Sequence, residues 1–326
     1  MRAQYLYLYL WLAAIIAAGL FVTARVIAQD ASAVARFAYV TNQGSETVSV
    51  VDLETFKVTL EIKVPGKPAG IARSKTMARI YVTSPGARDV AVIDAASNTI
   101  IRRIETGGGP VGIAAHPRNG LIYVADWYSK RLSVVDPEAG RVLADIEVGQ
   151  SPSGVAVTPD GALVLTADRD SNTVSLIDAA TNVRLAQIGV GARPFGITIS
   201  ADGARAYTAN VGSDDVSVVD IAQRAVMATV PVGRRPYAVA LTPTHAFVTN
   251  QYGGSVSIFD LATNTPVATV EVGDHPEGIA FDAARGAIYV ACWFENQLVR
   301  IDAGRRVVTG KAAVGDGPRA FGDFLR

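Results

Sequence analysis

The sequence is poor in the residue types from which most metal and catalytic sites are built. It contains one cysteine, Cys292, and three histidines, so it allows no intrachain disulfide. The absence of a Cys-x-x-Cys-His motif excludes covalent attachment of c-type haem. No Ser-His-Asp arrangement and no His cluster with metal-ligand spacing is recognisable. We therefore expect no cofactor, and we lean against an enzyme while leaving that question open.

The chain also lacks an excess of charge of either sign. Its 30 Lys and Arg residues equal its 30 Asp and Glu residues. Nucleic-acid binding requires a basic face, so we expect no nucleic-acid partner. Apolar residues make up 49% of the chain, but they occur in short alternating pieces, as β-strands require.

The N-terminus is the exception to this dispersed pattern. A short segment with Arg2 precedes residues 5–22, which carry no charge, and small residues follow up to Ala28. This order is typical of a signal peptide over residues 1–28, with residues 29–35 as a short linker. An uncleaved membrane anchor is the alternative, and it is the only membrane contact that we expect. The pattern predicts a periplasmic or secreted protein.

An internal repeat determines the fold that the sequence predicts. An aspartate closes an alternating apolar stretch at seven positions, separated by 42, 42, 42, 42, 40 and 42 residues: Asp52, Asp94, Asp136, Asp178, Asp220, Asp260 and Asp302. A proline recurs with the same six spacings: Pro68, Pro110, Pro152, Pro194, Pro236, Pro276 and Pro318. Such a period indicates one structural unit repeated seven times.

Each repeat contains four strand signals separated by turn residues. In the second repeat they are residues 79–83, 89–94, 99–104 and 111–115. Four antiparallel strands per 40-residue repeat predict an all-β, seven-bladed β-propeller over residues 36–326. Because the segment after Pro318 matches the first strand of the other repeats, we expect it to pair with residues 37–41 and close the ring.

The repeat also resembles a known family. Tyr39-Val-Thr-Asn42, followed by Thr47-Val-Ser-Val-Val-Asp52, resembles the YVTN-type, YncE-like β-propeller proteins. The first motif recurs in degenerate form at Tyr81, Tyr123, Phe247 and Tyr289. The resemblance covers residues 36–326 and implies the propeller fold. It implies no catalytic residue, because the proteins it relates this chain to share no catalytic motif.

Two sets of loops should meet at one end of the propeller, where we expect the functional site. Both tryptophans of the mature chain fall in one set, together with other aromatic residues, and the residues around the repeated prolines form the second set. The candidate binding residues are Trp127, Tyr128, Phe195, Tyr237, Tyr252, Trp293, Phe294, Arg193, Arg235, His275, Glu277 and Arg319. Large aromatic residues in exposed loops are common anchors at interfaces. The alternative is that they cover the channel or pack between blades.

Two further sets of polar residues have a structural interpretation. Asp126 and Asp168 are weak candidates for a hard cation such as calcium, but a side chain that caps its own loop explains their residue type better. The seven repeated aspartates should bond backbone groups in the turns that follow them. Cys292 is expected to be a small buried side chain.

A binding or interaction protein is the function that this pattern favours. Its partner would be a protein or a small polar or anionic ligand at the mouth of the channel, and we expect the protein to be a monomer. A lactonase-like hydrolase and an accessory subunit of a periplasmic quinoprotein-type redox system are the alternatives.

Overall fold

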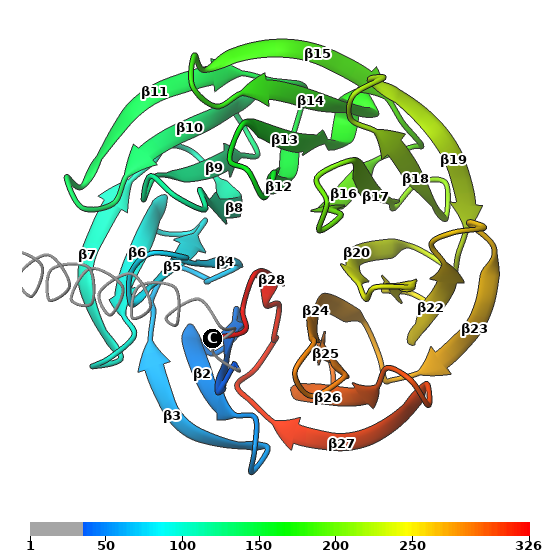
Figure 1. The fold of residues 1–326 in the computed structure, drawn as a ribbon. Coiled ribbons are helices and arrows are strands. Elements are labelled where there is room, and N and C mark those ends of the chain that lie inside the picture. Colours follow the sequence, from blue (N-terminus) through cyan, green and yellow to red (C-terminus); the bar gives the residue numbers. More distant parts are fainter. Residues whose placement is uncertain (1–34) are drawn as a thin grey trace, which may run out of the picture. The chain divides into compact units, whose positions relative to one another are not determined.

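The computed structural model describes residues 35–326, of which Arg36–Arg326 form one compact unit. Seven β-sheets follow one another in chain order and form a ring (Figure 1). The predicted all-β, seven-bladed propeller is confirmed. The predicted signal peptide lies outside the described residues, as does the linker up to residue 34. Residues 35–326 contain no helix with the length and hydrophobicity that a membrane span requires.

The strands of blades 1 to 3 are β1 (Phe37–Asn42), β2 (Thr47–Asp52) and β3 (Lys57–Lys63); β4 (Gly70–Arg73), β5 (Arg79–Ser84), β6 (Asp89–Asp94) and β7 (Thr99–Glu105); and β8 (Pro110–Ala115), β9 (Ile122–Asp126), β10 (Arg131–Asp136) and β11 (Arg141–Glu147). Those of blades 4 and 5 are β12 (Pro152–Val157), β13 (Leu163–Asp168), β14 (Thr173–Asp178) and β15 (Val183–Gly189); and β16 (Pro194–Ile199), β17 (Arg205–Asn210), β18 (Asp215–Asp220) and β19 (Ala225–Pro231). A short 3₁₀ helix, η1 (Arg169–Ser171), joins β13 to β14.

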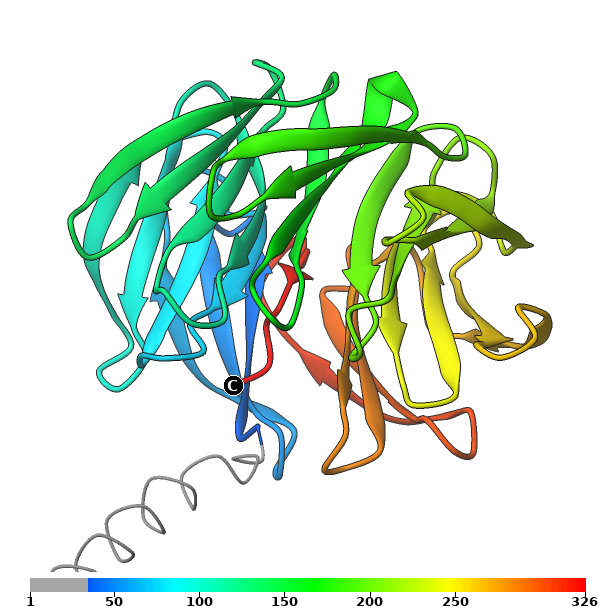
Figure 2. The same ribbon diagram turned by 45° about the horizontal axis from the view of Figure 1, so that its top comes forward.

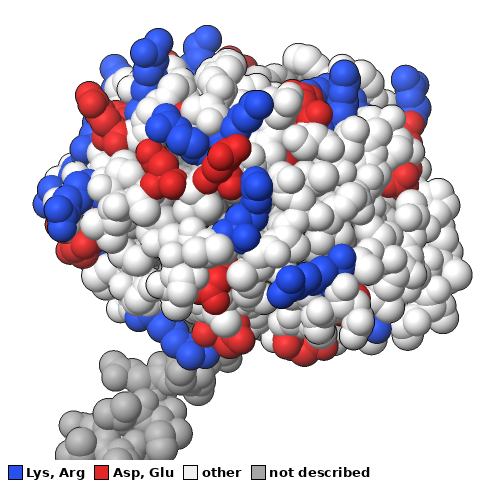
Figure 3. All heavy atoms as spheres, turned by 90° about the horizontal axis from the view of Figure 1, so that it is seen from above, with Lys and Arg blue, Asp and Glu red and all other residues white. Residues whose placement is uncertain are grey.

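Blades 6 and 7 contain β20 (Pro236–Leu241), β21 (His245–Asn250), β22 (Ser255–Asp260) and β23 (Pro266–Glu271); and β24 (Pro276–Asp282), β25 (Ala287–Cys292), β26 (Gln297–Asp302) and β27 (Val307–Ala313). The last strand is β28 (Phe321–Gly322). The two middle strands of each blade are largely buried because neighbouring blades cover both of their faces, whereas the outer strands alternate between exposed and covered residues. Basic and acidic side chains are interspersed over the side of the ring drawn in Figure 3.

The repeated Pro-x-Gly sequence brings the inner strands very close together. A Cβ on Gly112 would lie 1.7 Å from the carbonyl oxygen of Ser153 on the next inner strand, and one on Gly154 would lie 2.5 Å from that of Phe195. Only glycine permits this approach of backbones. Five of the inner strands also carry a bulge directly after the proline. The centre of the ring is therefore narrow.

The repeated aspartates hold the hairpins at one end of the ring, as predicted. In blade 2, for example, Asp94 Oδ1 accepts hydrogen bonds from the backbone N–H groups of Ala96 and Ser97, at 3.0 and 2.9 Å. These bonds stabilise the ionised carboxylate and lower the pKa of Asp94, and the pKa of Asp178 is lowered in the same way. Because the folded pKa lies below the unfolded one, this contribution to stability is present at neutral pH and is lost on strong acidification.

The C-terminal segment lies against β1, although it is not a regular fourth strand. Its two ends form bridges with β1, Pro318 with Asn42 and Leu325 with Ala38. Between them a bulge turns the short strand β28 away to pair in parallel with β4 of blade 2. Tyr39 N–H donates to the carbonyl of Phe324 at 2.9 Å.

A second contact between the first and last blades was not predicted. Phe56, in the β2–β3 hairpin, lies 5.9 Å from the ring of Tyr289 in blade 7 and 4.7 Å from the guanidinium carbon of Arg300. Its φ is +54°, a conformation that a bulky residue rarely adopts. At the corresponding position of blade 2, Asn98 accepts a hydrogen bond from Tyr39 of blade 1. Between blades 7 and 1, where the ring closes, Phe56 therefore makes aromatic contacts in place of this hydrogen bond.

Candidate functional site

The two predicted sets of loops do meet at one end of the ring, and Figure 2 shows the hairpins gathered at its two ends. Backbone hydrogen bonds join the two sets. Trp127 N–H donates to the carbonyl of Gly109 at 2.9 Å, and Trp293 N–H donates to that of His275 at 3.0 Å. We call this end of the ring, with the side chains that these loops and the adjoining inner-strand ends present, the mouth.

Three aromatic rings fill the centre of the mouth. Phe195 lies 4.4 Å from Tyr237, and Phe321 lies 5.0 and 5.4 Å from these two rings. Trp127 packs beside them, 6.0 Å from Phe195. We call Phe195, Tyr237 and Phe321 the aromatic plug.

The position of Phe195 and Tyr237 corrects the sequence-based expectation. Both were expected in exposed loops, but they are the second residues of β16 and β20 and are only 8% and 3% exposed. The strands begin at the repeated proline, so the residue after it belongs to the channel wall. Burial raises the pKa of the Tyr237 hydroxyl well above its ordinary value, which keeps it a neutral phenol.

An ion pair lies next to the plug. Arg319 Nε donates to Glu277 Oε2 at 2.8 Å, and the other oxygen of Glu277 accepts from Gln251 Nε2 at 2.7 Å. Glu277 is buried, whereas the Arg319 side chain remains 21% exposed. The guanidinium carbon lies 5.3 Å from the Trp293 ring and 5.8 Å from the Tyr237 ring. The cation is therefore held in a fixed orientation between two aromatic faces.

Farther from the centre, four predicted residues form a continuous stack. Arg235 lies over the Tyr252 ring at 4.5 Å and donates to its hydroxyl at 2.8 Å. His275 lies 5.2 Å from Tyr252 and 4.3 Å from Phe294, and its Nδ1 is 2.7 Å from Asp274 Oδ1. Tyr252 and Phe294 are 48% and 62% exposed, so this stack presents aromatic surface to solvent.

The remaining two predicted residues stand apart from these groups. Tyr128 is 78% exposed and its ring lies against Gly109, on which a Cβ would collide with it. Arg193 joins the two sets of mouth loops through hydrogen bonds of its backbone. Its N–H donates to Asn172 Oδ1 at 2.8 Å and its carbonyl accepts from Val211.

Sequence reasoning missed three mouth residues. Phe321 occupies the third position after its proline, where other inner strands carry Ile113 or Val155. Arg169 lies over the Trp127 ring at 5.4 Å and pairs with Asp170. Gln251 and Arg169 both occupy the loop position of Trp127 and Trp293, so the repeat itself marks them.

The weak metal candidates have structural roles. Asp126 accepts hydrogen bonds from the backbone N–H groups of Gly108, Gly109 and Tyr128. Asp168 is completely buried, accepts from three hydroxyl groups, among them Ser175 at 2.6 Å, and has a raised pKa because of burial. Within residues 35–326 no group of three or more His, Cys, Asp or Glu residues could hold a metal ion.

Cys292 is buried, as predicted. It is not part of a disulfide, and burial raises its pKa to about 12. A thiol in this state is a poor nucleophile.

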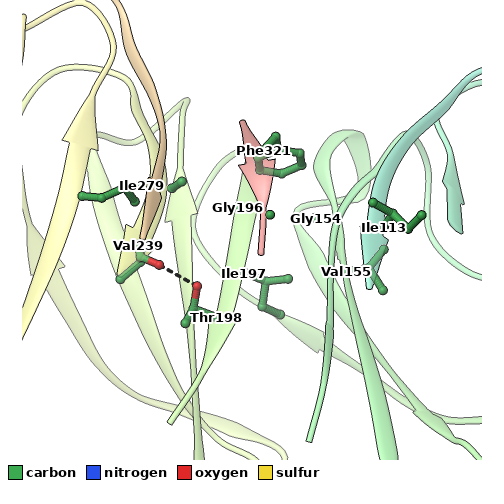
Figure 4. Close-up of a pocket in the computed structure, with 11 residues that line it drawn as sticks. Ile113, Gly154, Val155, Gly196, Ile197, Thr198, Val239, Ile279 and Phe321 are labelled. Atoms are coloured by element: carbon green, nitrogen blue, oxygen red, sulfur yellow. Dashed lines mark hydrogen bonds between the residues drawn. The ribbon is translucent and has the colours of Figure 1, made fainter. Parts of the chain in front are cut away.

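A small cavity lies between the inner strands, next to Phe321 of the plug. Figure 4 shows Ile113, Val155, Ile197, Val239 and Ile279 pointing into it, with Phe321 at its edge. The hydroxyl of Thr198 donates to the carbonyl of Val239 at 2.6 Å. The cavity offers about 50 Å³ to water-sized molecules, enough for a few waters and too little for a substrate.

A family model described as YNCE-like β-propeller matches residues 17–120. The chain is similar to the YncE-like propellers. This match supports the resemblance that the Tyr39-Val-Thr-Asn42 repeat indicated. No curated protein matches the chain significantly.

Solved structures show the same fold at low sequence identity. Hydrazine synthase of Kuenenia stuttgartiensis superimposes with a TM-score of 0.72 at 20% identity, covering 81% of this chain and 91% of that one. A functionally unknown protein from Desulfotomaculum acetoxidans DSM 771 gives a TM-score of 0.75 at 15% identity, covering 87% and 99%. At these identities the likeness concerns the fold alone.

Proposed function

We propose that the protein is an exported binding protein that captures its partner with the mouth of the propeller. Export rests on the signal-peptide pattern of residues 1–28. Binding rests on one observation above all, the aromatic cluster of the mouth, in which the partly exposed Trp127 and Trp293 flank the buried plug and the Arg319–Glu277 pair.

The arrangement at the mouth favours binding over hydrolysis. A general acid or base must reach a substrate with a free proton-transferring atom. Both carboxylate oxygens of Glu277, the buried acid at the centre of the mouth, are engaged by Arg319 and Gln251. Within residues 35–326 the plug fills the centre of the mouth, and the cavity next to Phe321 is too small to enclose a substrate away from water. A recognition surface formed by the exposed loop aromatics around the plug fits these facts better.

The double change Trp127→Ala and Trp293→Ala tests the proposal. Because buried aromatic anchors dominate binding energy, capture of the natural partner from periplasmic extract should weaken at least about 30-fold. The two side chains are partly buried, so the free energy of unfolding should fall by about 1–3 kcal/mol, leaving the protein folded.

Phe56→Ala provides a matched control for this experiment. It removes a buried aromatic ring from a hairpin at the opposite end of the propeller and should destabilise the fold comparably. Capture by this variant should be unchanged. Equal loss of capture in both variants would mean that stability, and not the mouth, limits binding.

A further inference from the structure

The charges at the mouth are largely compensated within the mouth itself. Arg319 pairs with Glu277, Arg169 pairs with Asp170, and His275 contacts Asp274. Further charged residues of both signs stand in the same loops, the acidic Glu46, Asp214, Glu295 and Asp316 and the basic Lys67, Arg88, Lys130, Arg193, Arg234 and Arg235. An anionic ligand would therefore gain little net attraction here, and neither would a cationic one.

The same pairs leave directed hydrogen-bonding groups at the surface. The Arg319 guanidinium has five N–H donors, and only its Nε donates to Glu277. Its side chain is 21% exposed, so the terminal nitrogens can reach a ligand without losing the ion pair. The Asp274 carboxylate, whose side chain is 61% exposed, adds acceptors beside the stack. The mouth thus offers fixed donors and acceptors with little net charge.

Exposed aromatic side chains stand in the loops of the mouth together with these polar groups. Tyr128, Tyr252 and Phe294 are 78%, 48% and 62% exposed. They share one loop position, at which blade 1 has Gly44 and blade 5 has Gly212. Since the fold accepts glycine there, folding does not require an aromatic ring. Exposed ring faces of this kind attract flat apolar surfaces such as the C–H faces of a sugar ring.

We propose that the mouth binds an uncharged oligosaccharide. Sugar rings would lie on the exposed aromatic side chains, and their hydroxyl groups, which both donate and accept, would meet Arg319 and Asp274. The aromatic positions belong to blades 3, 6 and 7, so a ligand spanning them would contain several sugar units. This assignment rests on the proposed function and names the class of its ligand.

Tryptophan fluorescence can test the assignment directly. The chain has three tryptophans, and in a Trp11→Phe background both of the others, Trp127 and Trp293, report on the mouth. Cellohexaose, chitohexaose and maltohexaose serve as neutral probes and hexagalacturonic acid as the anionic one. At least one neutral probe should shift the emission saturably, with a Kd that changes less than about twofold between about 50 and about 500 mM NaCl.

Single substitutions identify the side chains that contact the bound probe. Phe294→Ala and Tyr252→Ala should each weaken binding of that probe about tenfold. Trp127→Phe and Trp293→Phe, which keep most of the packing, should each alter the change in emission that the probe causes. Met227→Ala, which removes an exposed apolar side chain from the outer strand β19, should leave the Kd unchanged.

The outcomes separate the two proposals. If only hexagalacturonic acid binds, or if affinity falls steeply with salt, the neutral-sugar assignment is wrong. It is equally wrong if no oligosaccharide responds while periplasmic extract still changes the emission of Trp127 and Trp293, and in that case the mouth remains the binding surface. If neither sugars nor extract change the emission, both proposals fail.

Discussion

Deleting residues 317–326 should lower the melting temperature by roughly 10–20 °C and cause aggregation. The deletion removes three large buried apolar side chains, Phe321, Phe324 and Leu325. At about 2 kcal/mol each, their loss costs about 6 kcal/mol, which corresponds to that shift for a domain of this size. The deletion also removes the backbone partners of β1 and leaves its edge open to pairing with other chains.

A local variant controls for the ion pairs that the same segment makes. Asp323→Ala removes the half-exposed pairs with Arg73 and Lys75 and should cost no more than about 1 kcal/mol. Light scattering and thermal unfolding would measure both variants. A truncated protein that stays monomeric and melts with the full chain would show that the C-terminal segment does not close the ring.

Glu277→Ala is the second change with a large expected effect. It leaves the Arg319 guanidinium without its carboxylate among aromatic rings and leaves the Gln251 amide without its acceptor. Removing one partner of a fully buried pair costs 3–5 kcal/mol, and because Arg319 is partly exposed we expect about 2–3 kcal/mol. The melting temperature should fall by roughly 4–12 °C.

The double variant Glu277→Met, Arg319→Met distinguishes stability from recognition. Apolar residues of similar volume can replace a buried ion pair at little cost, so stability should return close to that of the parent protein. Ligand capture should nevertheless be lost, because the directed donors of Arg319 are gone. Recovery of both properties would show that the ion pair serves only the fold.

The sequence predicted the architecture because the architecture is repeated. A proline and an aspartate that recur seven times with matching spacings defined the blades. The repeated aspartate also predicted the hydrogen-bonded turn that follows it. Glu277 and Arg319 are 42 residues apart, which is the length of one repeat, and they form an ion pair. Equivalent positions of neighbouring blades lie side by side, so their contact follows from the period.

Features that break the repeat could not be predicted from it. The bulge that carries Phe321 into the channel depends on how the chain end fits beside β1 and β4. Phe56 is the only aromatic residue at its hairpin position among the seven blades, and it lies where the ring closes. The burial of Phe195 depends on the close approach of inner strands, which is a property of the closed ring and not of one blade.

Hydrogen–deuterium exchange with and without the captured partner is the most direct test of the mouth as the binding surface. Bound partner should slow exchange in residues 126–131, 250–255 and 292–297, which contain the mouth loops after the second strands of blades 3, 6 and 7. Exchange in residues 116–121 and 158–162, at the opposite end of the ring, should stay unchanged. Protection confined to the opposite end or to the outer strands would contradict the account.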